Sequence, residues 1–346
     1  MELGKKIRQL RFKAGLTQEQ LADKLGIGAQ SVSKWENGLS MPDISALPLI
    51  AEIFGVTIDD LFDLTTDQRL NRIENRMDAE EELPADVFRE FEDFLQAELK
   101  DKEHRKRATE LIAYLYFHRM NSDAQKATRY AKEAIVRAPG EKGCQWILSK
   151  TENHAVWDWN MANHSKAIAF YLDLVKKNPD EALPCMYLID NLIADRRADE
   201  AEYWLDRYCR LSKAHPVMKR VYRAYIALAR FDEPAADAIM EDLLEEQPEN
   251  DAVLFETAQY YAAKADYQKA IGIYERAFAA DKRRPRFQDA LMGIADIYEI
   301  TGDHAKAAAT YDRIVDLLEN EWGLTEETDS GVTAAKRKRD ALLANA

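Results

Sequence analysis

Apolar residues recur every three to four positions along most of this chain, the spacing that brings side chains to one face of an α-helix. The first such stretch covers residues 2–13, where Leu3, Ile7 and Leu10 share a face and Gly15 ends the helix. Shorter stretches of the same kind follow along the rest of the sequence. The pattern therefore predicts an all-α protein.

Two helices joined by a tight turn are expected directly after the first. Thr17 and Gln20 have the spacing of a capping box, in which each side chain binds the backbone amide of the other residue. Gly26 suits the left-handed residue that ends such a helix. The next helix is expected over residues 29–37, with Val32 packed inward. A pair of this kind can place its second helix in the major groove of DNA.

A fourth and a fifth helix complete this part of the chain. Asp43 is expected to cap the fourth helix, which buries Leu47 and ends before Gly55. Thr57 is expected to open the fifth helix. We therefore expect residues 1–64 to form one five-helix domain.

Many positions of this five-helix frame match a known pattern. They are Gly15, Leu16, Thr17, Gln18, Leu21, Ala22, Gly26, Val32, Trp35, Glu36, Asn37, Gly38, Pro42, Leu47, Phe54, Gly55 and Val56. With them, residues 3–63 resemble the lambda-repressor-like helix-turn-helix family (Cro/C1, also called XRE). The resemblance implies a DNA-binding domain whose third helix is the recognition helix, the one that reads bases.

The resemblance also implies which positions would meet DNA. Gln18 matches a contact to the DNA backbone. Gln30 would pair with adenine and Lys34 would donate to guanine, each contact contributing about 1–3 kcal/mol of discrimination. Ala29 can offer only an apolar contact. The full set is Gln18, Ala29, Gln30, Ser31, Ser33, Lys34 and Asn37. The alternative is that the polar members form a plain solvated helix face.

Two charged residues of the frame have a structural role in the family. Arg11 and Glu36 match a pair that ties the first helix to the recognition helix. We expect this pair to fix the recognition helix rather than to contact DNA.

Two further segments separate this domain from the rest of the chain. Residues 65–84 are mostly polar and are expected to form a partly helical linker, because Leu70, Ile73 and Met77 give a weak helical stripe. Residues 85–107 are expected to form a connecting helix with a broad apolar face. That face would either cap the region that follows or pair with a second subunit.

The remaining chain contains an internal repeat with a period near 34 residues. An alanine lies near the start of the second helix of each unit, at intervals of 40, 34, 35, 34 and 37 residues: Ala127, Ala167, Ala201, Ala236, Ala270 and Ala307. The small side chain allows close helix approach, and the residues four and seven positions later share its face. This spacing resembles the tetratricopeptide repeat (TPR) family. The resemblance implies about six repeats over residues 108–320, stacked as a right-handed superhelix, with a capping helix within residues 321–346.

A TPR superhelix has a concave surface, lined by the first helix of each pair. The same register projects aromatic, amide and charged side chains onto this surface: Tyr116, Arg119, Asn153, Trp159, Asn160, Met186, Tyr187, Asp190, Tyr222, Tyr225, Phe255, Glu256, Gln259 and Asp296. Amides can bind a peptide backbone, and aromatic faces can take its side chains. Three acids beside one arginine favour a neutral or basic ligand. The alternative is that the aromatic residues fill the core of the repeats.

The charge of the chain is unevenly distributed. The net charge is −14, but residues 1–38 carry seven basic against four acidic residues, so the remainder carries −17. A basic N-terminal segment followed by an acidic remainder predicts a small, salt-sensitive contact surface for DNA. Hydrophobic residues make up 47% of the chain and charged residues 32%, a composition typical of globular proteins.

The sequence predicts a cytoplasmic protein with no membrane partner. No apolar run approaches the roughly 18 residues that a membrane span needs, and MELGKKIRQLRFK lacks the apolar stretch of a secretory signal. Cys144, Cys185 and Cys209 are widely spaced and form no CxxC pair, which is typical of reduced thiols.

No catalytic constellation is found. The sequence has no HExxH, no P-loop and no GxSxG. His154, Asp158 and His164 share one segment, but they lie across an expected helix break, so a metal site is not expected there. We predict no enzymatic activity, no cofactor and no metal.

The order of the two parts resembles the bacterial peptide-sensing regulators of the Rgg/PlcR-like group. The resemblance implies a homodimer on a palindromic operator in double-stranded DNA. A peptide or protein ligand in the groove would change how the paired DNA-binding domains sit. Two alternatives stay open: the array is only an interaction or dimerisation scaffold, or the chain is an enzyme with a DNA-binding module, which would need a convergent polar pocket.

Overall fold

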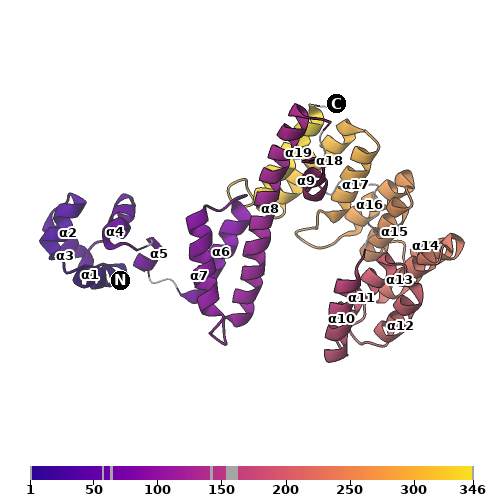
Figure 1. The fold of residues 1–346 in the computed structure, drawn as a ribbon, viewed down its shortest axis with the longest axis horizontal. Coiled ribbons are helices and arrows are strands. Elements are labelled where there is room, and N and C mark those ends of the chain that lie inside the picture. Colours follow the sequence, from indigo (N-terminus) through magenta and orange to yellow (C-terminus); the bar gives the residue numbers. More distant parts are fainter. Residues whose placement is uncertain (1, 57, 63–64, 141–142, 153–162, 345–346) are drawn as a thin grey trace. The chain divides into compact units, whose positions relative to one another are not determined.

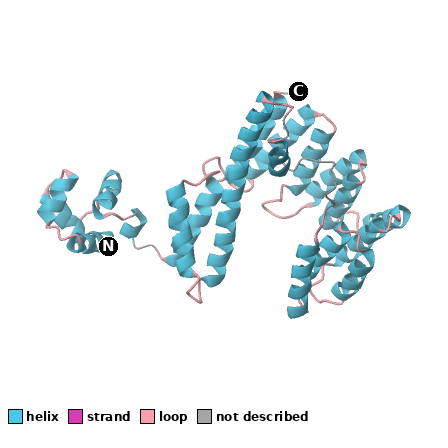
Figure 2. Cartoon of the chain, in the orientation of Figure 1, coloured by secondary structure: helices cyan, strands magenta, loops and turns pink. Residues whose placement is uncertain are grey.

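The computed structural model describes residues 2–56, 58–62, 65–140, 143–152 and 163–344. Every regular element within these ranges is a helix (Figure 2), which confirms the expected all-α fold. The chain divides into two compact units, Met1–Cys144 and Gln145–Ala346. None of the helices in the described ranges combines the length and hydropathy needed to cross a bilayer.

The first unit begins with a bundle of short helices (Figure 1). They are α1 (Glu2–Lys13), α2 (Gln18–Leu25), α3 (Ala29–Glu36), the 3-10 turn η1 (Ile44–Ala46), α4 (Leu47–Phe54) and α5 (Ile58–Phe62). Their apolar faces meet in one core, where Ile7, Leu21, Val32, Ile50 and Leu61 are fully buried. This is the five-helix frame that the apolar pattern predicts.

Local signals in the sequence set the ends of α2. The amide of Gln20 donates to Thr17 Oγ1 at 3.1 Å, and the amide of Thr17 donates to Gln20 Oε1 at 2.8 Å. Gly26 ends the helix in the left-handed region, with φ 68°. The predicted capping box and the predicted stop are both confirmed.

The start of α4 differs from the expectation. Asp43 Oδ1 accepts the amide of Ser45 at 2.9 Å, so it caps the turn η1 and not the helix. The reason is that one 3-10 turn intervenes before α4 begins at Leu47. Thr57, expected to open the fifth helix, lies outside the described residues.

α1 and α3 approach so closely that only glycine fits at position 4. A Cβ built on Gly4 would lie 1.9 Å from the carbonyl oxygen of Trp35 and 2.9 Å from its carbonyl carbon. The obstacle is backbone at the end of α3, so it cannot swing aside as a side chain can. Gly4 therefore sets the distance between these two helices.

Three longer helices complete the first unit. α6 (Thr66–Ala79), α7 (Ala85–Glu98) and α8 (Arg105–Arg137) pack around a core of Leu70, Met77, Phe91, Leu95 and Leu115. The segment 65–84, expected to be a partly helical linker, thus supplies a complete helix whose apolar stripe is buried. A capping box between Thr65 and Gln68 starts this helix. The weak apolar stripe of Leu70, Ile73 and Met77 is thus the face by which α6 packs against the other helices.

α8 is one continuous helix of 33 residues. The repeat register placed a second helix near Ala127, with a turn before it, but this alanine lies inside α8. The segment contains neither glycine nor proline, so no residue in it breaks the helix. The first expected helix pair is therefore absent from the described part of residues 108–140.

The second unit consists of stacked helices (Figure 1). They are α9 (Gln145–Thr151), α10 (Ser165–Lys177), α11 (Ala182–Ala194), α12 (Ala198–Cys209), α13 (Pro216–Ala229), α14 (Glu233–Glu246), α15 (Asp251–Ala263), α16 (Tyr267–Ala280), α17 (Asp289–Ile300), α18 (His304–Asn320) and α19 (Ser330–Leu343). From α11 to α18 each helix packs against its neighbours in sequence, and α19 covers α18. Successive helix pairs of this kind are what the repeat predicts.

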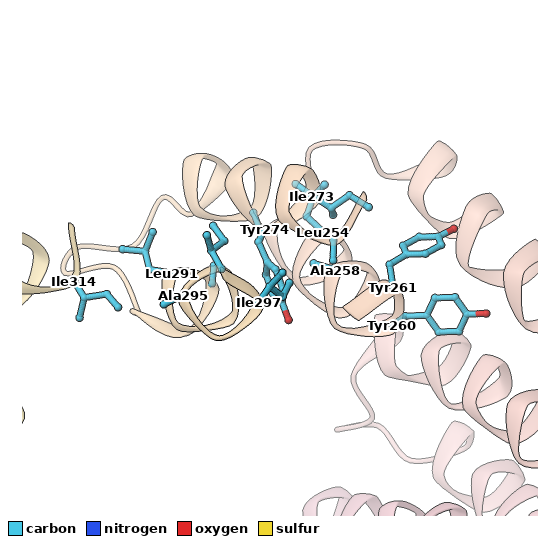
Figure 3. Close-up of a cluster of buried hydrophobic side chains, with 14 of the residues drawn as sticks. Leu254, Ala258, Tyr260, Tyr261, Ile273, Tyr274, Leu291, Ala295, Ile297 and Ile314 are labelled. Atoms are coloured by element: carbon cyan, nitrogen blue, oxygen red, sulfur yellow. The ribbon is translucent and has the colours of Figure 1, made fainter. Parts of the chain in front are cut away.

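The alanines of the repeat register lie at the helix contacts. Ala201, Ala236, Ala270 and Ala307 are fully buried in α12, α14, α16 and α18. In the pair α15/α16, Leu254 and Tyr274 both belong to the buried core (Figure 3). Each small residue allows its helix to approach the preceding one, as the sequence predicted.

In each of the four pairs α11/α12, α13/α14, α15/α16 and α17/α18, one residue of the connecting turn lies in the left-handed region. Arg196, Phe231, Ala265 and Gly302 have φ of 55°, 64°, 60° and 76°. Only the last is glycine. A left-handed conformation costs other residues about 1–2 kcal/mol each. The packing of the helix pair thus imposes this turn even where the local sequence does not favour it.

Candidate nucleic-acid interface and ligand groove

The outer face of α3 carries the residues that the sequence assigned to DNA. Gln30 and Lys34 are exposed, as is Asn37 at the end of the helix. Ala29, Ser31 and Ser33 are half-buried. On the opposite face Val32 and Trp35 are buried in the core. The helix therefore presents one polar edge to solvent while its other edge is fixed.

A buried ion pair holds α3 against α1. Arg11 Nε lies 2.6 Å from Glu36 Oε1, and Arg11 Nη2 lies 2.8 Å from Oε2. The two side chains are only 7% and 1% exposed. Burial alone would raise the pKa of Glu36, but the hydrogen bonds from Arg11 and Gln18 outweigh it, so the pKa is lowered. The carboxylate is thus charged and fully engaged inside the domain.

The same carboxylate orients Gln18. Gln18 Nε2 donates to Glu36 Oε2 at 2.8 Å. A charged carboxylate can only accept, so the amide must turn its nitrogen to Glu36 and its oxygen away. The sequence assigned Gln18 to DNA and did not foresee this bond, because residues 18 and 36 come together only when α1, α2 and α3 pack.

The groove residues expected on the second unit fall into two groups. Tyr187, Asp190 and Gln259 are exposed, whereas Tyr225, Phe255, Glu256 and Met186 are half-buried. Tyr222 is only 2% exposed and packs edge-on against Tyr208, so it fills the repeat core, as the alternative interpretation held. The remaining residues come from α11, α13 and α15, the first helices of three successive pairs.

Carboxylates line the first helices of this array. Burial raises the pKa of Asp190 on α11, although the Tyr222 hydroxyl opposes this by donating a hydrogen bond to it. Burial also raises the pKa of Glu256 on α15, and the charge of Asp190 adds to the effect. The pKa of Asp296 on α17 is raised as well, by burial and by Glu299.

The other expected groove residues do not join this set. Tyr116 and Arg119 lie on α8 in the first unit, where both contact Phe88: the tyrosine edge-on at 5.6 Å and the guanidinium over the ring at 4.5 Å. Asn153, Trp159 and Asn160 lie outside the described residues.

Comparisons with known proteins match both parts of the chain. A helix-turn-helix family model matches residues 6–61, and a tetratricopeptide repeat model matches residues 255–321. The HTH-type transcriptional activator BcrR of Enterococcus faecalis is 46% identical over 61 residues, covering 18% of this chain and 30% of that protein. An uncharacterized HTH-type transcriptional regulator of Methanocaldococcus jannaschii is 40% identical over 57 residues, covering 16% of this chain and 86% of that protein. The chain belongs to the helix-turn-helix transcriptional regulators.

Each of these curated relatives matches only a short part of the regulator. The matched part spans 30% of BcrR and 46% of ImmR from Bacillus subtilis, which is 37% identical over 59 residues, or 17% of this chain. Over the whole regulator, the crystal structure of Bacillus thuringiensis PlcR in complex with the peptide PapR7 and DNA is 12% identical, with a TM-score of 0.29. That alignment covers 99% of this chain and 98% of PlcR.

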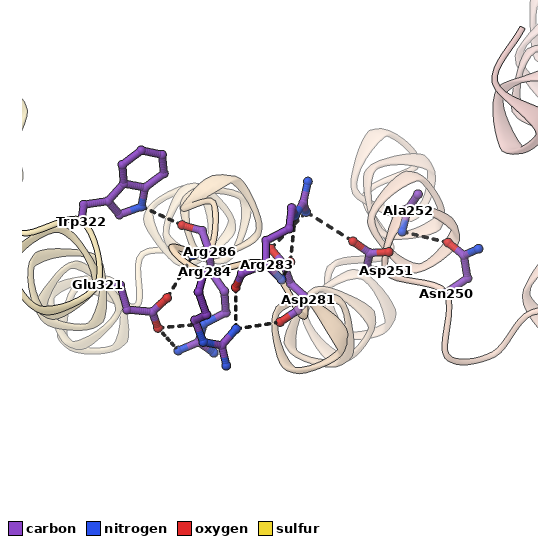
Figure 4. Close-up of polar contacts among 9 residues, drawn as sticks. All are labelled: Asn250, Asp251, Ala252, Asp281, Arg283, Arg284, Arg286, Glu321 and Trp322. Carbon is purple, nitrogen blue, oxygen red and sulfur yellow. Dashed lines mark hydrogen bonds and ion pairs between the residues drawn. The ribbon is translucent and has the colours of Figure 1, made fainter. Parts of the chain in front are cut away.

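The sequence did not reveal a polar clamp in the regulator between α16 and α17. Arg283 binds both oxygens of Asp281, at 2.8 and 3.0 Å, and reaches Asp251 at 3.3 Å (Figure 4). Arg286 binds Glu321, and Trp322 Nε1 donates to the carbonyl of Arg286 at 2.7 Å (Figure 4). The long connection 281–288 is thereby tied to α15 and to the end of α18.

This clamp closes one side of a cavity of about 210 Å³. Its lining combines aromatic rings with carboxylates and includes Phe255, Glu256, Phe278, Arg283, Phe287 and Asp289. One trace in the sequence is Pro285, which follows Ala270 by 15 residues, whereas Pro248 follows Ala236 by 12, and this delay indicates an extended turn. The register alone does not show that this turn folds back over α15.

Proposed function

We propose that the regulator binds a specific sequence in double-stranded DNA through the outer edge of α3, and that a peptide in the repeat groove changes this binding. One observation carries the first half. The outer edge of α3 is polar and solvent-accessible, while Arg11, Glu36 and Gln18 fix the helix from behind. A recognition helix has to be held rigidly for its side chains to discriminate between bases.

The exposed residues have different roles in this proposal. Gln30 reads adenine with its amide, and Lys34 donates to guanine, each worth about 1–3 kcal/mol of discrimination. Ser31, Ser33 and Ala29 are half-buried and make the closer contacts, and Asn37 meets the DNA backbone. Gln18 presents its carbonyl oxygen and its second amide hydrogen outward, because the first hydrogen is bound to Glu36. The regulator acts in the cytoplasm as a homodimer on a palindromic operator.

The acidic groove supports the second half. Asp190, Glu256 and Asp296 occupy three first helices of the array, and burial raises the pKa of each. A basic group placed among them would relieve this desolvation cost. The half-buried rings of Tyr225 and Phe255 can take apolar side chains. We therefore propose an extended peptide with basic residues as the ligand.

Ligand binding controls DNA affinity only if the ligand binds one arrangement of the regulator more tightly than another. The peptide contacts the first helices of several pairs at once. It therefore favours the curvature of the array in which those contacts are made together. That curvature sets the spacing of the two α3 helices in the dimer.

DNA selection from a random pool tests the first half. The full chain should enrich a palindromic sequence. Gln30→Ala should relax preference at one base pair of each half-site, whereas Gln18→Ala should weaken binding to most sequences alike. Gln96→Ala, at an exposed position of α7, is the matched control and should change neither. An unchanged base-substitution profile for Gln30→Ala contradicts this placement of α3.

The same selection with and without cell-extract peptides tests the second half. The proposal expects operator affinity to change when peptides are added and a peptide to be recovered from the purified regulator. The competing function is a scaffold whose array only recruits a protein or forms the dimer, and the burial of Tyr222 in the core favours it. Recovery of a stoichiometric protein partner, together with an operator affinity that no peptide changes, would establish the scaffold instead.

A further inference from the structure

We propose that the cavity between α15, α16 and α17 is a specificity pocket that takes an arginine side chain of the bound peptide. This inference rests on the proposed function, because it assumes an extended peptide along the first helices. It adds which residue type the array selects and where. The pocket is defined here by Phe255, Glu256, Phe278, Arg283, Phe287 and Asp289.

The size of the cavity favours a side chain over a whole small molecule. Its volume is about 210 Å³, below the roughly 300–1,000 Å³ of pockets that enclose drug-sized ligands. The aromatic rings of Phe255, Phe278 and Phe287 and the side chains of Ala252, Ala277 and Ala290 form its apolar lining. A long side chain with an apolar stem fits such a lining.

The charge of the cavity favours a cation. Four carboxylates line it, those of Asp251, Glu256, Asp281 and Asp289, against the single guanidinium of Arg283. Arg283 is already bound to Asp281 and Asp251. Asp251 and Asp289 also stand in the first turns of α15 and α17, where a negative charge stabilises a helix without any ligand. Glu256 has no such role, since it lies in the second turn of α15.

Glu256 is therefore the residue that points to a ligand. It is half-buried, and burial together with the charge of Asp190 raises its pKa. No cation of the described chain forms an ion pair with it. A cation entering from the groove would meet this carboxylate and the ring of the adjacent Phe255.

The pocket already contains an example of the chemistry it would offer. The guanidinium of Arg283 lies 4.6 Å from the ring centre of Phe287 while it binds the carboxylate of Asp281. A guanidinium is planar and weakly hydrated, so it stacks on a ring and binds a carboxylate through two N–H groups at once. An ammonium group cannot do both equally well. The geometry thus favours arginine over lysine.

The test uses the full chain and two matched probes, N-acetyl-arginine amide and N-acetyl-citrulline amide, followed by ligand-observed NMR. The probes share their shape but only the first is charged. We expect saturable binding of the arginine probe and none of the citrulline probe. Glu256→Gln should weaken the arginine probe about tenfold, the loss expected for a hydrogen bond to a charged group. Asp289→Asn is a second variant and should weaken it less.

Glu245→Gln is the control, because Glu245 is an exposed acid of α14 outside the cavity. It should leave the affinity of the arginine probe unchanged. Equal binding of the two probes, equal losses in Glu245→Gln and Glu256→Gln, or no loss in Glu256→Gln while its thermal unfolding stays cooperative would each overturn the pocket.

A peptide library separates this inference from the proposed function. Panning random heptapeptides on the full chain should enrich arginine at one position, and Glu256→Gln should abolish that preference. Peptides that bind and change operator affinity without a preference for arginine would overturn the pocket and leave the proposed regulation standing. Enrichment of arginine by peptides that never change operator affinity would support the pocket and remove the proposed regulation.

Discussion

The recognition domain and the repeat array each contain a carboxylate removed from water, but the two carboxylates differ in their partners and in the direction in which their pKa is changed. Glu36 is almost fully buried, but Arg11 and Gln18 bind both of its oxygens and its pKa is lowered. Glu256 is half-buried, and nothing offsets the burial that raises its pKa. The first acid is bound by its own chain, whereas the second is left open toward the groove.

This difference distinguishes a carboxylate that stabilises the fold from one that is available to bind a ligand. An acid that its own chain neutralises stabilises one arrangement of helices, and here it fixes α3 against α1. An acid that the chain leaves without a cation weakens the fold slightly and gives binding energy to whatever cation arrives. Within the array the same contrast exists between Asp237, which binds Tyr260 and Lys264, and Glu256.

The largest effect should come from removing the acid of the framework pair. Glu36→Ala leaves the buried Arg11 guanidinium without its carboxylate partner and with only the carbonyl of Leu16 as acceptor, which should cost about 3 kcal/mol of the stability of the recognition domain. Hydrogen exchange of the α3 amides in the full chain measures this loss. Replacing both partners, Arg11→Met with Glu36→Leu, should cost far less, because no buried charge remains. A single variant as stable as the double variant would show that the pair is not buried as described.

A substitution at Gly4 tests whether geometry or charge fixes α3. Gly4→Ala drives a methyl group against the carbonyl of Trp35, 1.9 Å from the new Cβ. Because the obstacle is backbone, α1 must move, at a cost of about 2 kcal/mol. Urea unfolding of the full chain measures it. Gly28→Ser is the control, since nothing lies within 4 Å of its Cβ and serine caps helices well. Equal stability of the two variants would contradict the close contact of α1 and α3.

Asp237→Asn tests a carboxylate of the array that, like Glu36, is bound by its own chain. Asp237 accepts from the Tyr260 hydroxyl at 2.5 Å and from Lys264 Nζ at 2.6 and 2.8 Å. Losing its charge weakens these bonds, and we expect a loss of about 1 kcal/mol, or a melting temperature lower by roughly 2–4 °C. Calorimetry of the full chain measures it. A rise in the melting temperature would mean that bound and unbound acids of the array do not differ.

Glu256→Gln should have the smallest effect, of opposite sign. Burial and the charge of Asp190 disfavour the charged form of Glu256, so removing that charge should raise the melting temperature by about 1–2 °C at neutral pH. Since the pKa of Glu256 is raised on folding, its cost is present above that pKa and fades as the pH falls through it. The gain should therefore vanish near about pH 4, where glutamate is protonated in the unfolded chain as well.

Several polar or charged groups also interact with Glu256 or line the same cavity: Asp190, Tyr222, Tyr225, Asp251, Tyr274, Asp281, Arg283 and Asp289. Melting curves of Glu256→Gln and Glu245→Gln between pH 4 and 7 isolate its own share, because the other groups are common to both variants. A gain that persists unchanged at about pH 4 would locate the effect elsewhere than in the charge of Glu256.

Local signals explain why the recognition domain could be predicted in detail. The side chains of Thr17 and Gln20 bind each other's backbone amides, and Gly26 adopts the left-handed conformation, so these nearby residues alone fix the ends of α2. The buried alanines of the array, such as Ala236 and Ala270, could also be placed, because their period repeats. In both cases the information lies within a few residues or within a regular interval.

Features that depend on distant residues could not be predicted in this way. The absence of glycine and proline around Ala127 permits α8 to continue through it but does not specify that it does. The bond from Gln18 to Glu36 requires three helices to be packed first. The cavity beside Glu256 requires the connection 281–288 to fold back, which its extra length permits but does not specify.

The left-handed residues in the turns of the helix pairs imply at which end the array begins to unfold. Arg196, Phe231 and Ala265 occupy a conformation that disfavours them, whereas Gly302 adopts it freely in the last pair, where α19 also covers the exposed end. In a stack whose units touch only their neighbours, opening starts at the least stable unit and spreads along the row. Fraying should thus begin toward α11 and reach α18 last.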